Sequence, residues 1–273
     1  MSMGEKPTQL DIIRHGKSET NNAHRRLEAG LALENVPTDV NSSLTEDGKR
    51  QAWSRGEEEA PRALQWKASD IVVISSTHTR AQQTADIIVA RLNAYRAEDD
   101  QVILQEPDER FGEYAMGITD PAYIAKYPEL LRRTLLAMKH NIRERMYVRP
   151  AHDLTEREKE IADQLGLVTL AEREGEAMVD IEPRLRNGLA DLEPLINQDG
   201  KLVILVCHGG ASIMLRKILL DENPEDLITL LEAQRNAGIP IWNGARSTYQ
   251  RRKDGTWDMV VWNSRLASET TSK

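Results

Sequence analysis

Short apolar runs alternate along the chain with stretches in which apolar residues recur at helical spacing. Such runs are typical of strands that a sheet buries on both faces. The predicted strands are residues 10–13, 71–74, 102–104 and 202–206, with two later candidates at 247–250 and 259–262. The predicted helices are residues 45–53, 79–92, 181–196 and 211–220. This alternation predicts an α/β fold, a three-layer α/β/α domain with a mostly parallel central sheet.

Two segments depart from the alternation. From about residue 114 to residue 180 the sequence is charged and helical in pattern and contains no convincing strand. We therefore expect a helical insertion over the active-site edge of the sheet, within a single domain that spans residues 1–273. Residues 264–273 are polar, and we expect them to form a frayed tail.

The composition narrows the class of protein. The chain is 40% hydrophobic and 29% charged, as in an ordinary soluble globular protein. Its formal net charge of −8 disfavours nucleic acid as a partner, because that binding depends largely on basic groups. The single cysteine, Cys207, can form neither an internal disulfide nor a cysteine-rich metal site. With no signal-peptide pattern and no membrane-spanning stretch, we expect a cytoplasmic protein that does not bind membranes.

Histidine and arginine residues follow three of the predicted strands. Arg14-His15-Gly16 follows the first strand, Arg80 lies just beyond the second, and His208-Gly209 ends the strongest one. Because open α/β sheets bind ligands at the carboxyl ends of their strands, we expect these side chains to meet. Two imidazoles and two guanidiniums would repel one another unless a dianion lay between them, and Arg matches phosphate oxygens well. The sequence therefore indicates a phosphate site.

The same segments resemble the histidine phosphatase superfamily, which includes the cofactor-dependent phosphoglycerate mutases and many phosphatases. Four blocks match its motifs in order: Arg14-His15-Gly16 with Asn21 (R-H-G-x-T-x-x-N, with Ser18 in the Thr position), Leu44-Thr45 with Gly48, Gln51 and Ala52 (L-T-x-x-G-x-x-Q-A), Ser75-Ser76 with Arg80-Ala81 and Gln83-Thr84-Ala85 (S-x-x-x-R-A-x-Q-T-A), and Cys207-His208-Gly209-Gly210 (the closing strand and H-G turn). The matches extend over nearly the whole chain.

The resemblance implies roles for the matched residues. His15 would be the nucleophile that accepts a phosphoryl group and passes it to water. The phosphoryl oxygens would be held by Arg14, Arg80 and His208, and the substrate would also be bound by Asn21 and Gly209, all of which lie in the matched motifs. Because these fixed cations can neutralise the phosphoryl oxygens by themselves, we expect neither a metal nor an organic cofactor. The expected activity is hydrolysis of a small phosphomonoester.

Two other activities stay open. A phosphoglycerate-mutase-like phosphotransferase is one, although the G-L-N-K-A-E continuation of those enzymes is absent. A non-catalytic member that binds a phosphorylated ligand is the other, although such a protein would not need His15. The sequence identifies neither the substrate nor the oligomeric state.

The proton donor for the leaving group has two candidates. The family has an acidic residue, usually Glu, four positions before a glycine that follows an aromatic or apolar residue. Counting back from Gly112 without a gap selects Asp108, whereas a deletion of one residue selects Glu109. We favour Glu109, because Glu is the usual type and Asp is one methylene shorter. If neither of these is the donor, Glu106 and Glu113 are the next candidates. The W-E-G of many phosphatase members is not found at Met116-Gly117.

The predicted insertion carries a basic segment. Seven basic residues against Glu129 and Glu144 give residues 126–149 a charge of +5. The seven are Lys126, Arg132, Arg133, Lys139, Arg143, Arg145 and Arg149. They would either bind a second anionic group of the substrate or form a solvated helix face. His24, His78, His140 and His152 show no ligand spacing, and we expect them on the surface or in loops.

Overall fold

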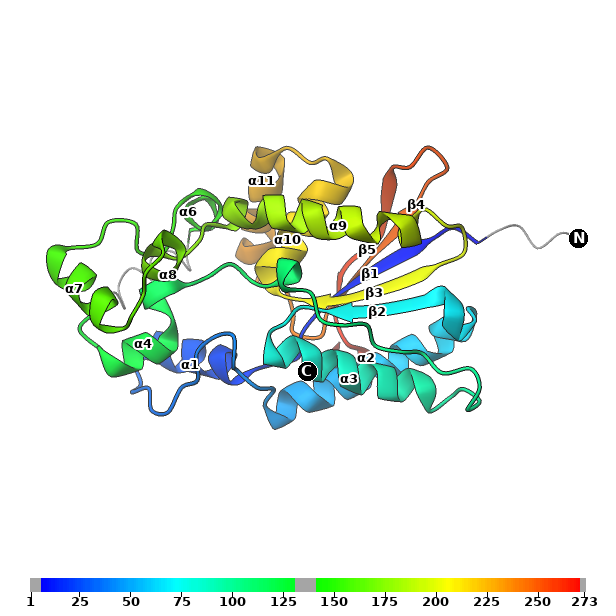
Figure 1. Ribbon diagram of the computed structural model, residues 1–273, viewed down its shortest axis with the longest axis horizontal. Helices are drawn as coiled ribbons and strands as arrows, with labels where there is room; N and C mark the ends of the chain where they lie inside the picture. Colours follow the sequence, from blue (N-terminus) through cyan, green and yellow to red (C-terminus); the bar gives the residue numbers. More distant parts are fainter. Residues whose placement is uncertain (1–5, 131–140, 271–273) are drawn as a thin grey trace, which may run out of the picture.

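The computed structural model describes residues 6–130 and 141–270. Among them, five strands form one sheet in the order β2-β3-β1-β4-β5 (Figure 1). The strands are β1 (Gln9–Arg14), β2 (Ile71–Ser75), β3 (Leu202–Cys207), β4 (Arg246–Arg251) and β5 (Trp257–Ser264). β1 and β2 run parallel to β3, whereas β4 pairs antiparallel with β1 and β5. The predicted α/β class is confirmed, with a parallel core and an antiparallel edge.

Helices cover both faces of the sheet (Figure 1). Leu10 and Ile12 of β1 pack in one core cluster with residues of α9, α10 and α11, and Ile13 packs in a second cluster with residues of α2 and α3. The covering helices are α2 (Glu46–Ala63), α3 (Thr79–Asn93), α9 (Glu182–Ile196), α10 (Gly209–Leu220) and α11 (Pro224–Asn236). Every residue of β2 and β3 is buried, which explains their uninterrupted apolar sequences. The predicted three layers are therefore present.

Residues 102–104 do not form the predicted strand. Only Leu104 makes a β-bridge, to Val73 of β2, and Ile103 is exposed. The backbone N–H and C=O of Val102 bind instead to the side-chain amide of Asn93, at 2.8 and 2.9 Å. With its hydrogen bonds taken by a side chain, this segment cannot extend a ladder along β2.

The described parts of the segment from 114 to 180 lie beyond the carboxyl ends of the parallel strands, next to α1 (Glu19–Glu28) (Figure 1). Its described helices are α4 (Pro121–Lys126), α6 (Ile142–Tyr147), α7 (Glu156–Gln164) and α8 (Leu170–Glu174), with 3₁₀ turns at Gly117–Thr119 and Met178–Ile181. It has a small core of its own, built around Ile118, Leu130 and Ile161. Arg132, Arg133, Lys139 and His140 lie outside the described residues.

The end of the chain differs from the expected frayed tail. Leu266 is buried, and α12 (Ala267–Thr270) follows it. The backbone N–H of Ala267 donates to Glu58 of α2 at 2.8 Å. One apolar side chain and these contacts anchor a segment whose composition is otherwise polar, while residues 271–273 lie outside the described part. No helix in the described residues is long and apolar enough to cross a membrane.

Candidate active site

His15 follows β1 directly and is 2% exposed. Its Nδ1 lies 2.6 Å from the carbonyl oxygen of Gly16. A carbonyl oxygen can only accept, so Nδ1 carries the proton and Nε2 keeps its lone pair. Burial, together with the charges of Arg80 and Arg14, lowers the pKa of His15 well below 6.5. The imidazole is therefore neutral near neutral pH, with one nitrogen able to act as a nucleophile.

The loop after His15 is supported by the second sequence motif. A Cβ on Gly16 would collide with the backbone of Gly48 at the start of α2, and a Cβ on Gly48 would collide with Lys17. The N–H of Gly16 donates to the Thr84 hydroxyl at 3.1 Å, and the N–H of Lys17 donates to Gln51 Oε1 at 2.8 Å. Close packing of two glycines thus brings a helix end against the loop that carries His15.

Arg80 lies against His15, held by a carboxylate that the sequence did not indicate. Its Nε donates to His15 Nε2 at 2.9 Å. Its Nη2 donates to the Asp39 carboxylate at 2.9 Å, and its Nη1 donates to the Asp39 carbonyl oxygen. Burial alone would raise the pKa of Asp39, but the Arg80 guanidinium holds that pKa well below its usual range. Asp39 is therefore ionised and fixes the orientation of Arg80.

His208, at the end of β3, faces His15 with 5.1 Å between ring centroids. Its Nε2 lies 2.6 Å from the Ser76 hydroxyl, and the His78 ring packs against it at 4.4 Å. Burial and the charge of Arg80 lower the pKa of His208 well below 6.5. We expected His78 on the surface or in a loop; it lies in the loop between β2 and α3, but buried beside His208. Its position just after β2 was the signal that could have placed it here.

Arg14 completes the group of basic side chains. Its Nη1 donates to the Ile241 carbonyl oxygen, and burial lowers its pKa to about 10. Arg14 Nε and His208 Nδ1 are buried without a hydrogen-bond partner in the described protein. A Cβ on Gly209 would lie 3.4 Å from Arg14 Nε, so glycine leaves that nitrogen accessible. Buried polar nitrogens without partners are rare, and here they are suited to oxygens of an anion.

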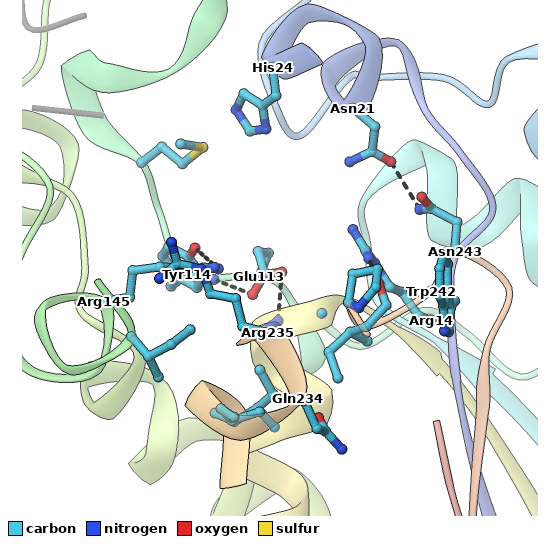
Figure 2. A pocket seen from close by; sticks show the side chains of 18 of the residues that line it. Arg14, Asn21, His24, Glu113, Tyr114, Arg145, Gln234, Arg235, Trp242 and Asn243 are labelled. Atoms are coloured by element: carbon cyan, nitrogen blue, oxygen red, sulfur yellow. Dashed lines mark hydrogen bonds between the residues drawn. The ribbon is translucent and has the colours of Figure 1, made fainter. Parts of the chain in front are cut away.

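Asn21 lies in the wall of the adjoining cavity, in the first turn of α1. Its Oδ1 accepts from the N–H of Ser18 at 3.1 Å and from Asn243 Nδ2 at 3.0 Å (Figure 2). Asn243 also lies 3.3 Å from the carbonyl oxygen of His15. No sequence pattern pointed to Asn243, because it lies in an irregular loop far along the chain.

The structure does not bring Glu109 to this site. Its side chain is exposed, does not line the cavity, and makes no hydrogen bond or ion pair among the described residues. Asp108, the alternative, is engaged by Arg110 at 2.6 Å, and this contact helps to lower its pKa against the effect of burial. Both residues precede Gly112, and neither lines the cavity.

Glu113, which follows that glycine, does reach the cavity (Figure 2). Its carboxylate accepts from the N–H groups of Gly210 at 3.0 Å and Ala211 at 3.2 Å, at the start of α10. A Cβ on Gly210 would collide with this carboxylate, so glycine is required there. Glu113 also faces Arg14, whose pKa its charge raises against the larger effect of burial. Of the carboxylates that line the cavity, Glu113 is the one whose charge acts on Arg14.

The cavity has a volume of about 570 Å³ and opens beside Arg14 and Gly209. It lies between α1, the insertion, α10 and α11, and the loop 238–243 closes one side. His15, Arg80 and His208 are buried next to Arg14. Of the residues predicted from the sequence, the structure therefore brings together Arg14, His15, Arg80, His208, Asn21 and Gly209.

Comparisons with known proteins found a matching family model and solved structures of similar fold. The model of the histidine phosphatase superfamily (branch 1) matches residues 10–166. No curated protein matches the chain. A mycobacterial glucosyl-3-phosphoglycerate phosphatase complexed with VO3 is 21% identical, with a TM-score of 0.59 over 94% of this chain and 99% of that one. Bacillus stearothermophilus YhfR is 19% identical (TM-score 0.59, 94% and 98% covered). A phosphoglycerate mutase from Bacillus anthracis is 17% identical (TM-score 0.57, 95% and 94% covered), and these likenesses show a shared fold.

Proposed function

The chain belongs to the histidine phosphatase superfamily, and we propose that it hydrolyses phosphomonoesters through a phosphohistidine intermediate on His15. The observation that carries the proposal is the neutral, buried imidazole whose Nε2 lies 2.9 Å from Arg80 Nε. Once the N–H of Arg80 Nε passes from His15 Nε2 to a phosphoryl oxygen, the neutral histidine can attack phosphorus while the cation beside it holds the oxygens of the transferred group. A module that only bound phosphate would not need that lone pair.

In the first step, His15 Nε2 forms a bond to phosphorus while the bond to the ester oxygen breaks. Arg14, Arg80 and His208 hold the three other oxygens, where charge is greatest in phosphoryl transfer. The leaving oxygen keeps the electron pair of the broken bond and takes a proton from Glu113. In the second step, water attacks phosphorus as the bond to His15 Nε2 breaks and its electron pair returns to that nitrogen. The Glu113 carboxylate takes a proton from the water, and inorganic phosphate leaves with the neutral imidazole restored.

The test is to trap the intermediate. After brief incubation with a ³²P-labelled phosphomonoester and quenching in alkali, we expect label on His15 that acid treatment removes. His15→Asn should lose both label and turnover, whereas His152→Asn, which changes an exposed histidine, should keep both. Substantial turnover by His15→Asn would refute the mechanism.

Two further arms of this experiment separate the alternatives. Activity that survives a chelator is expected, whereas loss that zinc or magnesium reverses would indicate a metal-dependent phosphatase. Transfer of label from phosphorylated enzyme to phosphoglycerate, in preference to water, would indicate a mutase instead. Absence of both label and turnover in the wild type would favour a binding protein.

A further inference from the structure

The cavity beside Arg14 is much larger than a phosphoryl group requires and is largely apolar beyond it. Apolar side chains come from α1, α10, α11 and the loop 238–243. They include Leu27, Ile213, Leu231, Ile239, Ile241 and Trp242. A short polar leaving group would leave this surface in contact with water, whereas an apolar one would cover it. The lining therefore favours an extended apolar leaving group.

One cation of the predicted basic segment also lines the cavity. Arg145 lies on α6 and donates from Nη2 to the Tyr114 hydroxyl at 2.7 Å (Figure 2). Its guanidinium carbon lies 5.8 Å from the centre of that ring. Among the described residues Arg145 makes no ion pair, while its neighbour Arg143 pairs with Glu225 at 3.0 Å. Arg145 thus offers donors to the cavity that no carboxylate occupies.

The other charged groups of the cavity are engaged elsewhere or lie at its rim. The Glu113 carboxylate is held by the start of α10, and Glu176 accepts from the N–H of Ala115 at 2.7 Å. Arg25 and Glu28 belong to the exposed side of α1, and Arg235, on α11, is likewise exposed. Arg145 is therefore the cation best placed to meet an anion that enters alongside an apolar group.

We propose that this cavity selects phosphomonoesters whose leaving group has an apolar body ending in a second anionic group, and that Arg145 binds that anion. The proposal rests on the proposed function, since it describes the leaving group of the same reaction. The phosphoryl group would lie at Arg14, the apolar body against Ile213 and Leu231, and the anion at Arg145 beside Tyr114.

The test compares alkyl phosphates with ω-carboxyalkyl phosphates of matched length, from butyl to octyl. In the wild type, kcat/KM should rise with chain length, and the carboxylate should add about ten- to a hundred-fold at the best length, as for a hydrogen bond to a charged group. Arg145→Gln should abolish this ratio between the two substrates. Arg143→Gln, which changes an exposed arginine on the same helix, should leave the ratio unchanged.

A second variant tests the apolar wall. Leu231→Asn should flatten the rise with chain length, and activity on p-nitrophenyl phosphate will show whether that variant folds. Hydrolysis that depends on neither chain length nor the carboxylate would overturn this inference alone. A carboxylate preference that survives Arg145→Gln would overturn the role of Arg145. If the wild type releases no phosphate from any substrate, p-nitrophenyl phosphate included, the proposed function itself fails.

Discussion

Replacing Asp39 with asparagine should lower turnover while tightening the binding of inorganic phosphate. Asp39 engages two of the three guanidinium nitrogens of Arg80, which leaves Nε directed at His15. In the proposed mechanism this arrangement aligns Arg80 with the phosphoryl group. The same carboxylate also neutralises much of the charge on Arg80 and repels an incoming dianion. The substitution should therefore move kcat and the inhibition constant of phosphate in opposite senses.

The size of the effect follows from the burial of the pair. Arg80 is 3% exposed, so its 2.9 Å bond to the Asp39 carboxylate is little screened by solvent. A hydrogen bond to a charged group contributes about 1.5–3 kcal/mol. If that free energy serves to align Arg80 in the transition state, its loss lowers kcat by about ten- to a hundred-fold. Asparagine retains an acceptor oxygen, so we expect the lower end of this range.

The assay measures kcat, KM and the inhibition constant of phosphate with p-nitrophenyl phosphate as substrate. Asp47→Asn is the control, since Asp47 is half exposed and pairs with Lys17. The depressed pKa of Asp39 means that the pair stabilises the fold at neutral pH and that this contribution is lost as the pH falls below about 4. The stability difference between wild type and Asp39→Asn should therefore shrink in acid. An unchanged kcat, or weaker phosphate binding, would refute the reasoning.

Two further predictions concern the proton donor and the stability of the fold. Glu113→Gln should slow hydrolysis of an alkyl phosphate by about 10²–10⁴-fold and of p-nitrophenyl phosphate much less, because nitrophenolate leaves without a proton. Glu109→Gln, the control, should slow neither reaction. Equal losses on both substrates in Glu113→Gln would contradict the role of Glu113. Arg55→Ala should destabilise the fold by about 3–5 kcal/mol in urea unfolding, because it removes a fully buried cation from Glu58 and Glu59; an unfolding midpoint near that of the wild type would contradict this.

The sequence could predict the site residues that follow the carboxyl ends of the parallel strands. An apolar run buried on both faces locates a parallel strand, and the residue that follows must emerge at the carboxyl edge of the sheet. His15 and His208 each follow such a run, and Arg80 lies within the first turn of the helix after another. Their convergence follows from parallel pairing alone, without knowledge of any loop.

The remainder of the site depends on the paths of irregular segments. Asp39 and Asn243 reach the site from loops, and neither lies at a spacing that a local pattern could reveal. Glu113 ranked behind Glu109 and Asp108 because the direction in which a side chain leaves a tight turn depends on the packing of that turn. Residues 102–104 failed as a strand because Asn93, on a neighbouring helix, takes the hydrogen bonds of Val102. Competition of this kind between a side chain and a neighbouring strand depends on the tertiary structure, so the pattern of apolar and polar residues cannot reveal it.

The hydrogen bond from His15 Nδ1 to the Gly16 carbonyl oxygen also determines which ring nitrogen would carry the phosphoryl group in the proposed reaction. Because it leaves only Nε2 able to attack, the phosphoryl group would always be carried on the same ring nitrogen. Each in-line transfer inverts the configuration at phosphorus, and the reaction has two such transfers, the first to the imidazole and the second to water. A phosphorothioate monoester made chiral with ¹⁸O and hydrolysed in H₂¹⁷O should therefore release thiophosphate with the configuration at phosphorus retained.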